Sequence, residues 1–243
     1  MKTIFSVIHT GFFYILMFFD VLVLVIGYTF FSSKRNRVSK NEYETMINRL
    51  ARNWAKRQMR NTGAKINVSG TENIPQDEAV LFVSNHQSYF DIGLFLAYIE
   101  KNKGFIAKIG VQKIPLIRNY MNDLNCIYID RGNLRQNMET ILEGIEILKN
   151  GYSLVIFPEG TRNIDMQNFK AGSFKLAIKS GVPVVPVTID GAYKILPKGK
   201  KLINRASLNM VVHQPIPTKD LSKQEEKNLH NVIEDLVRNG FKI

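Results

Sequence analysis

Two side chains in this sequence, His86 and Asp91, have the types and the spacing that general-base chemistry needs. Residues 79–83 form a short, continuous apolar run, which is typical of a strand buried on both faces of a parallel sheet. Apolar residues at helical spacing begin near Tyr89, so His86 is predicted to lie in a strand-to-helix turn. Turns at the carboxyl ends of strands are where open α/β sheets bind ligands.

The separation of these two residues decides whether they can act together. On one continuous helix, side chains at this spacing would point roughly 140° apart, at about 100° per residue. If His86 precedes the helix and Asp91 lies in its first turn, the carboxylate can hold one imidazole nitrogen while the other faces a substrate. A less specific alternative is a capping box, in which Ser88 is the N-cap, Asp91 is its partner and His86 is only a loop residue.

Two further apolar runs end in residues that suit anion binding. One run ends at Ile129 and leads into Arg131, and another ends at Phe157 and leads into a tight turn that contains Gly160 and Arg162. A guanidinium beside free backbone N–H groups is a suitable phosphate cradle. Each arginine taken alone is also typical of a solvated loop charge.

The composition predicts a globular protein that seeks anionic partners. The chain has 243 residues, of which 45% are hydrophobic and 22% charged, enough for one sizeable core plus an appendage. A formal net charge of +12 indicates nucleic acid, an anionic membrane surface or phosphate-bearing small molecules, and the hydrophobic N-terminus favours the membrane. The single cysteine, Cys126, excludes an internal disulfide framework and is expected to be a small buried apolar residue. One Cys and four scattered His give no metal-ligand spacing, so no metal site is predicted.

The N-terminal stretch is long and apolar. Residues 3–31 contain no Lys or Arg and one carboxylate, Asp20. As one helix they would reach about 44 Å, against a hydrocarbon core of about 30 Å. A tilted membrane span and two shorter pieces that dip into the membrane are both compatible, and Asp20 favours an interfacial break near its position. Basic residues at 34–40 outnumber Lys2 on the other side, which places the rest of the chain on the cytoplasmic face.

A basic amphipathic helix is predicted over Glu42 to Arg60. Its basic face is compatible with an ordinary solvated face. Beside an apolar segment, such a helix is more often bound to a membrane surface, which is the favoured interpretation.

From residue 63 onward the pattern alternates between strands and helices, which predicts an α/β domain. We expect strands at 79–83, 126–129, 153–157 and 182–189, and helices at 134–149, 174–179 and after a capping box formed by Ser222 and Glu225. The predicted fold is a central, mainly parallel or mixed sheet flanked by helices. The predicted organisation is a membrane-associated helical segment at 1–62 and an α/β domain at 63–243. Two prolines within 182–187 indicate an edge strand.

Four motifs in order resemble those of the glycerolipid acyltransferases, most closely the 1-acylglycerol-3-phosphate (lysophosphatidic acid) acyltransferases. They are NHQSYFD at 85–91, CIYIDR at 126–131, FPEGTR at 157–162 and VPVVPV at 182–187. The resemblance covers roughly residues 65–212. Family members often carry a Lys-x-Glu-Leu element before the second motif, and here only its lysine, Lys108, can be carried over.

The resemblance implies roles for individual residues. His86 is the base that activates an acceptor hydroxyl, and Asp91 orients it. It also implies acceptor-binding residues, and residues that are either near the acyl donor or structural. The acceptor-binding set is Arg131, Glu159, Gly160, Thr161, Arg162 and Lys108, and the second set is Val182, Pro183 and Pro186.

The implied reaction moves an acyl chain from a thioester to the sn-2 hydroxyl of 1-acylglycerol 3-phosphate and forms phosphatidic acid. The donor is acyl-CoA or acyl carrier protein, and no cofactor or metal is expected. The implied partners are a lysophosphatidate substrate and an anionic membrane surface, with a membrane-docked N-terminal helix pair and no nucleic acid. Alternatives are acylation of glycerol 3-phosphate or another lysophospholipid, a phosphohydrolase, or a membrane-anchored module that binds anionic lipid.

Overall fold

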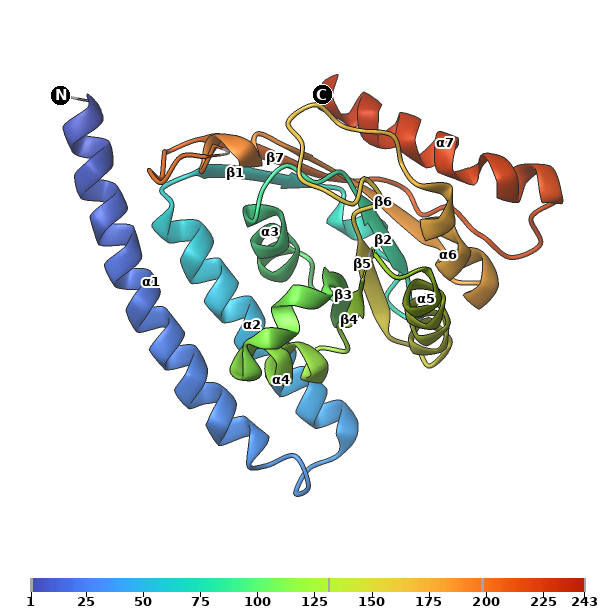
Figure 1. Ribbon diagram of the computed structural model, residues 1–243, viewed down its shortest axis with the longest axis horizontal. Coiled ribbons are helices and arrows are strands. Elements are labelled where there is room, and N and C mark those ends of the chain that lie inside the picture. Colours follow the sequence, from blue (N-terminus) through green and yellow to red (C-terminus); the bar gives the residue numbers. More distant parts are fainter. Residues whose placement is uncertain (1, 131, 198, 243) are drawn as a thin grey trace. The chain divides into compact units, whose positions relative to one another are not determined.

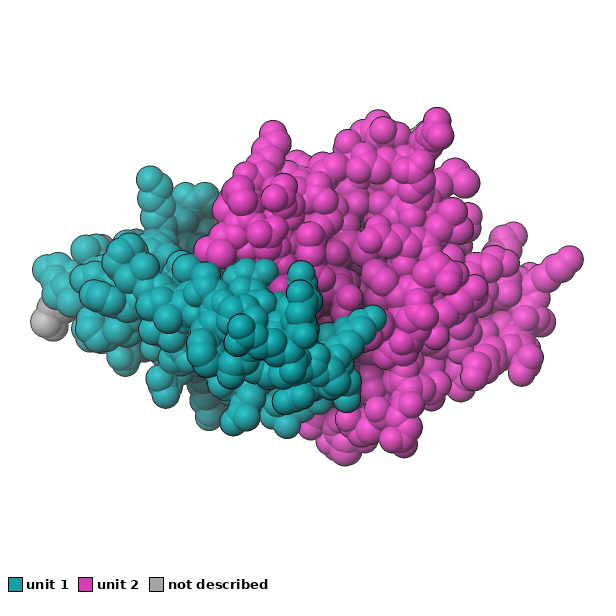
Figure 2. All heavy atoms as spheres, turned by 90° about the horizontal axis from the view of Figure 1, so that it is seen from below, with its two compact units in different colours: residues 1–68, 87–100, 189–210 teal, residues 69–86, 101–188, 211–243 magenta. Residues whose placement is uncertain are grey.

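The computed structural model describes residues 2–130, 132–197 and 199–242, and Figure 1 shows the order of its helices and strands. The chain forms two compact units, which are coloured separately in Figure 2. Two strands, β6 (Val184–Asp190) and β7 (Ser207–Val212), have residues in both units. Unit 1 consists of residues 1–68, 87–100 and 189–210, and unit 2 of residues 69–86, 101–188 and 211–243.

Unit 2 is built on parallel strands in the hydrogen-bonding order β6-β2-β5-β3-β4. β2 (Leu81–Ser84) pairs with β6 on one side and with β5 (Ser153–Ile156) on the other. β3 (Lys103–Lys108) pairs with β5 and with the short outer strand β4 (Ile127–Ile129). Because these pairings are all parallel, the carboxyl ends of the strands lie at one edge of the sheet.

The sheet is mixed rather than wholly parallel. An antiparallel bridge joins Val184 of β6 to Ile216, and β7 lies next to β6 in the strand order. In unit 1, β7 also neighbours the first strand, β1 (Lys65–Ser69). The predicted α/β class with a mainly parallel or mixed sheet is therefore confirmed.

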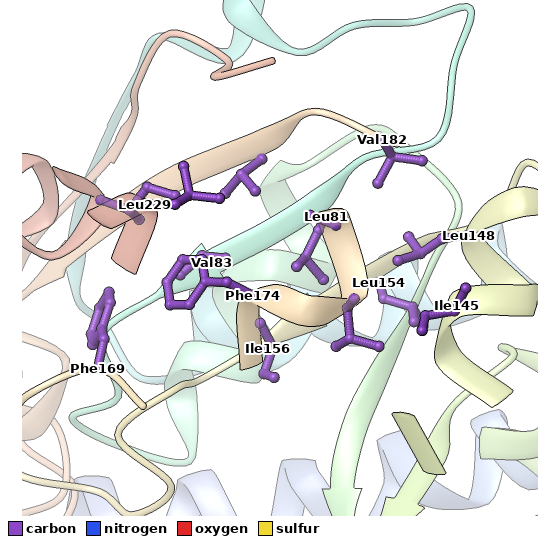
Figure 3. Close-up of a cluster of buried hydrophobic side chains, with 14 of the residues drawn as sticks. Leu81, Val83, Ile145, Leu148, Leu154, Ile156, Phe169, Phe174, Val182 and Leu229 are labelled. Carbon is purple, nitrogen blue, oxygen red and sulfur yellow. The ribbon is translucent and has the colours of Figure 1, made fainter. Parts of the chain in front are cut away.

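Apolar side chains from strands and helices meet in one core within unit 2. Leu81 is in register with Leu154 on one side and with Val184 on the other, and all three are fully buried. Figure 3 shows Phe174 and Leu229 beside the strand residues of this cluster. Burial on this scale, at about 25 cal/mol per Å² of apolar surface, is the main stabilising contribution to the fold.

The helices of unit 2 begin and end at the residues that the sequence signals. α5 spans Leu134–Lys149, and its N-cap Asn133 accepts a hydrogen bond from the Gln136 backbone at 3.1 Å. α6 (Lys175–Ser180) ends at Gly181, whose φ of 74° is the left-handed conformation that glycine adopts most readily.

The C-terminal helix α7 (Lys223–Asn239) starts with the predicted capping box. Ser222 accepts from the Glu225 backbone, and the Glu225 side chain accepts from the Ser222 backbone. Unit 2 also contains α4 (Pro115–Asp123), which the sequence patterns did not indicate. The described short 3₁₀ turns are η1 (Thr71–Asn73), η2 (Ile109–Lys113), η3 (Ala171–Phe174), η4 (Ala192–Lys194) and η5 (Gly240–Lys242).

Unit 1 contains three long or medium helices, α1 (Lys2–Ser32), α2 (Lys40–Asn61) and α3 (Phe90–Tyr98), and α2 packs against both of the others. The apolar face of α2 has a four-residue spacing and is almost completely buried. This buried face corrects the expectation that the apolar side of residues 42–60 rests on a membrane, because that side is covered by protein, while binding of the basic side to a membrane surface stays a prediction. The buried residues are Tyr43, Ile47, Ala51, Ala55 and Met59.

The expected break near Asp20 is also wrong, since α1 is continuous from Lys2 to Ser32. The Asp20 carboxylate accepts hydrogen bonds from Arg57 at 2.5 Å, Gln58 at 2.8 Å and Asn61 at 3.2 Å. These partners on α2 satisfy the charge, so the helix has no reason to unwind there. The sequence alone could not show that α2 supplies them.

The proline-rich strand β6 lies between β7 and β2 and is not an edge strand, which corrects the prediction. Pro183 precedes the strand, and its carbonyl accepts from the Leu81 N–H at 3.0 Å. Pro186 lies inside the strand, and its carbonyl accepts from the His213 N–H at 2.9 Å, just past the end of β7. Proline has no N–H to donate, and at Pro186 this missing donor faces a point where β7 has already ended. A proline inside β6 is therefore tolerated.

Candidate active site

The carboxyl edge of the unit 2 sheet carries most of the predicted site residues. His86 follows β2 by two residues, residues 157–162 follow β5, and Lys108 is the last residue of β3. Since these strands are parallel neighbours, the turns that follow them belong to the same edge. Arg131, which follows β4, lies outside the described residues.

The backbone of His86 is fixed on both sides by the loop after β5. Its N–H donates to Glu159 Oε1 at 2.6 Å, and its carbonyl accepts from the Asn163 N–H at 2.8 Å. The imidazole stacks on Phe157, with ring centroids 4.2 Å apart and an interplanar angle of 18°. His86 is thus a half-buried histidine whose main chain and ring are both held in place.

Glu159 is a buried carboxylate whose two oxygens both bind backbone N–H groups. Oε1 accepts from His86, and Oε2 accepts from Gln167 at 2.9 Å. Burial raises the pKa of Glu159, while the hydrogen bonds from Gln167 and His86 act in the opposite direction. In this arrangement Glu159 shapes the turn that carries His86, and its contact with an acceptor stays a prediction.

Asp91 belongs to unit 1, where it is fully buried in the first turn of α3. Its Oδ2 accepts from the backbone N–H groups of Gln87 at 2.7 Å and Ser88 at 2.8 Å. Ser88 is not the N-cap as the alternative supposed, because Tyr89 occupies that position without a side-chain cap bond. The carboxylate therefore holds the two residues that directly follow His86 in the chain, while its role in orienting the imidazole stays a prediction.

A tight turn follows β5 as predicted, and its role in anion binding stays a prediction. Gly160 has a φ of 77°, and its N–H donates to the Phe157 carbonyl at 3.0 Å. Thr161 and Lys108 are exposed and Arg162 is half-buried. The turn thus leaves a hydroxyl and a guanidinium at the carboxyl edge of the sheet.

Val182, Pro183 and Pro186 are buried in unit 2. Val182 belongs to the hydrophobic core cluster, the Pro183 carbonyl accepts from Leu81 of β2, and the Pro186 carbonyl accepts from His213, just past β7. Of the two roles implied for these residues, the structural one matches these contacts.

Some contacts of the site were not predicted from the sequence. Phe157 is the first residue of the FPEGTR motif and Asn163 directly follows the motif, so the motif was a usable signal for both. Glu234 of α7 accepts from the Phe169 N–H at 2.7 Å, and no sequence signal links that helix to the loop. Among the described residues, no group of three or more His, Cys, Asp and Glu is placed to hold a metal ion.

Comparison with known proteins agrees with this geometry. The chain is 39% identical over 156 residues to a chloroplastic 1-acyl-sn-glycerol-3-phosphate acyltransferase of Arabidopsis thaliana, which covers 63% of this chain but 44% of that protein. It is 32% identical over 177 residues to a 1-acyl-sn-glycerol-3-phosphate acyltransferase of Borreliella burgdorferi, with 72% and 71% covered. The chain therefore spans less than half of the plant relative and about seven tenths of the bacterial one.

A solved structure and a family model extend the comparison. The crystal structure of the 1-acyl-sn-glycerophosphate acyltransferase PlsC from Thermotoga maritima matches with a TM-score of 0.86 and 31% identity, covering 100% of this chain and 97% of that one. The sequence model of the acyltransferase family matches residues 65–190, which include His86, Asp91 and the turn at 157–162. The resemblance carried by the four motifs is confirmed: this chain belongs to the acyltransferase family.

Proposed function

We propose that the protein transfers an acyl chain from an acyl thioester to the sn-2 hydroxyl of 1-acylglycerol 3-phosphate, forming phosphatidic acid. The observation that carries the proposal is the fixed His86 turn beside the Gly160–Arg162 turn at one sheet edge. A base and an anion-binding turn at adjacent strand ends suit an acceptor that has both a hydroxyl and a phosphate. The names of the relatives and of the solved neighbour support the same acceptor.

In the proposed mechanism His86 acts as a general base, with Asp91 as its orienting group. The imidazole takes the proton of the acceptor hydroxyl as its oxygen attacks the thioester carbonyl. A tetrahedral oxyanion forms and must be stabilised by nearby hydrogen-bond donors. Its collapse forms the ester and breaks the C–S bond, and the leaving thiolate recovers the proton from the imidazolium.

The acceptor phosphate is assigned to the basic residues that follow neighbouring strands. Arginine can hold a phosphate with two parallel hydrogen bonds, which suits Arg162 and Arg131, and Lys108 adds charge at the end of β3. The exposed Thr161 completes the proposed set, and Gly160 contributes the positive φ that forms the turn. The donor is proposed to be acyl-CoA or acyl carrier protein, and an acyl-donor competition assay separates the two.

We place the enzyme at an anionic membrane surface, with the catalytic residues on the cytoplasmic face. In unit 1, α1 is the one described helix long and apolar enough to cross a membrane, over Ile4–Ser32, and many of its apolar side chains are exposed. A cytoplasmic location follows from the basic residues at 34–40. Labelling of a cysteine introduced at position 2, in intact cells, tests on which side of the membrane the N-terminus lies. Burial raises the pKa of the Cys126 thiol to about 12, so Cys126 itself should not react with the label.

Unit 2 offers a second apolar surface around α4. Ile114, Leu116 and Ile117 are 51%, 38% and 41% exposed, and the exposed Lys113 and Arg118 flank them. The other side of this segment lines a polar cavity of about 540 Å³, with Gln112, Asn122, Tyr128 and Glu139 among its walls. A segment with its apolar side outward and basic residues beside it suits an anionic lipid surface.

The central experiment uses purified full-length protein in vesicles with lysophosphatidate and labelled acyl thioester. We expect labelled phosphatidic acid from the wild type and a rate lower by about 10²–10⁴-fold from His86→Ala. The half-buried His230 on α7, outside the 157–162 turn and the His86 turn, provides His230→Ala as a control for loss of an imidazole. Binding of lysophosphatidate without product from the wild type would favour the lipid-binding module. Product from glycerol 3-phosphate instead would move the proposal to that acceptor.

A further inference from the structure

The loop between β5 and η3, residues 157–170, contains no helix or strand, although it carries the anion-binding turn. A loop of this kind depends on side chains to satisfy its backbone and to hold its shape. Within unit 2, two carboxylates do this. Glu159 accepts from the Gln167 N–H at 2.9 Å, and Glu234 of α7 accepts from the Phe169 N–H at 2.7 Å.

Glu234 is itself held in place on the helix. Arg238, one turn later, donates to Glu234 Oε1 at 2.8 Å and reaches the Met166 carbonyl at 3.5 Å. The Glu234 side chain is 14% exposed and the Arg238 side chain 44% exposed, so the carboxylate is the shielded member of this ion pair. Met166 and Phe169 are buried in the same core cluster as the apolar face of α7, so polar and apolar contacts fix the loop together.

The loop in turn holds His86 at two points. Asn163 donates its N–H to the His86 carbonyl at 2.8 Å, and Glu159 accepts from the His86 N–H at 2.6 Å. A continuous series of hydrogen bonds and short backbone segments therefore runs from Glu234 through the loop to the turn that carries the base. α7 lies outside residues 65–190, the part matched by the acyltransferase family model.

We propose that Glu234 is a positioning residue for catalysis, which sets the His86 turn and the anion-binding turn through the 163–169 segment. The inference rests on the proposed function, because its kinetic test measures the proposed acyl transfer. Glu234 touches no reacting atom in this scheme. Its effect is geometric, because a displacement of about 1 Å at a reacting group can reduce the rate about 10²-fold.

Three variants of the full chain test the proposal kinetically, well below each melting temperature. Glu234→Ala removes the acceptor for the Phe169 N–H, and we expect kcat/KM to fall about 10²-fold. Glu234→Gln keeps an oxygen in the same place, and we expect it to lose less than about 10-fold, since the neutral bond is weaker but present. Asp235→Asn removes one charge from the next, exposed residue of α7 and should leave the kinetics unchanged.

Hydrogen exchange measured on the same proteins separates this inference from the proposed activity. Glu234→Ala should speed backbone exchange in residues 163–169 and also in the segment around His86, whether or not lysophosphatidate is the acceptor. Faster exchange confined to 163–169, or normal kcat/KM in a folded Glu234→Ala protein, would overturn the positioning role. A loss of thermal stability with unchanged kinetics would assign Glu234 to folding alone. Wild-type protein without acyl transfer would refute the proposed function and leave the exchange result to decide this inference.

Discussion

The carboxylate of Glu159 is buried, and both of its oxygens accept hydrogen bonds from backbone N–H groups. Each N–H bond favours the ionised form, but removal from water disfavours it more strongly, and the pKa of Glu159 is raised as a result. A raised pKa means that the folded protein holds this proton more tightly than the unfolded chain does. Glu159 therefore contributes stability below its ordinary pKa, and this contribution is lost as pH rises through the folded value.

Glu159→Gln tests that linkage. We expect the wild type to lose unfolding free energy relative to the variant as pH rises from about 4.3, the ordinary value for glutamate, through the raised pKa. The slope for one proton cannot exceed about 1.4 kcal/mol per pH unit. Urea unfolding of both proteins at several pH values between 4 and 7 measures it, and parallel curves would contradict the assignment.

Arg162 is the second prediction at this scale. Arg162→Lys keeps the charge but removes the planar fork, so a bidentate phosphate contact cannot be reproduced. We expect kcat/KM with lysophosphatidate to fall by about 10-fold or more, with little change for a neutral monoacylglycerol. Acceptor kinetics and the melting temperature should be measured together, because a purely structural arginine would lower the melting temperature and leave acceptor selectivity intact.

Among the elements, α7 contacts the 157–170 loop through Glu234 and strand β6 through its C-terminal end. Thr188 Oγ1 donates to the Val237 carbonyl at 2.8 Å and lies 2.8 Å from His213 Nε2. Gly240, just past the helix, lies so close that an added Cβ would be 2.2 Å from Thr188 Oγ1. The absence of a side chain at Gly240 is what lets the helix end reach the strand.

Gly240→Ala should therefore destabilise the protein by about 1–3 kcal/mol, since the short, branched Thr188 side chain has little freedom to move away. Gly172→Ala is the matched control, because a Cβ there meets nothing within 4 Å. Melting temperatures of the two variants should differ by several degrees. Equal values would show that the Thr188 contact relaxes at no cost.

Elements with local signals were predictable, and those that depend on distant partners were not. α5 has the predicted bounds because Asn133 caps its start, and the Ser222–Glu225 box marks α7 equally well. The interior position of β6 in the sheet depends on where β7 ends. The continuity of α1 depends on Arg57, Gln58 and Asn61 of α2, which bind Asp20. Likewise, His86 and the 157–162 turn were found from the sequence, whereas Glu234 lies on a helix that no motif includes.

At the scale of the molecule, the N-terminal helices α1 and α2 are part of a folded unit, unit 1. α2 packs against α3, and a Cβ at Gly93 would lie 3.1 Å from the Met59 sulfur. Since Ile47, Ala55 and Met59 are fully buried, removing α2 uncovers apolar surface on its neighbours. The predicted boundary between a membrane-associated segment at 1–62 and an α/β domain at 63–243 stays a prediction.

Deleting residues 1–62 is expected to give an aggregating or incompletely folded protein, whereas deleting residues 1–38 keeps α2 and should preserve a cooperative unfolding transition. The shorter deletion should reduce sedimentation with anionic vesicles, because the exposed apolar side chains of α1 are gone. Near-UV circular dichroism and vesicle sedimentation of both proteins provide the measurement. A well-folded, soluble product from the 1–62 deletion would contradict the contribution of α2 to unit 1.

The Asp20 contacts also have a consequence for the order of events during synthesis. Asp20 leaves the ribosome 37 residues before Arg57 and 41 before Asn61, so the newly made α1 carries a carboxylate without these three partners. An unpaired carboxylate costs about 2.5–3.5 kcal/mol at a bilayer centre, which opposes deep insertion at that stage. Once α2 has been made, Arg57, Gln58 and Asn61 can donate to the carboxylate and offset part of that penalty. If α1 lies beside lipid as proposed, the emergence of α2 sets when it can settle there, and the nascent chain passes through a stage in which Asp20 lacks these partners.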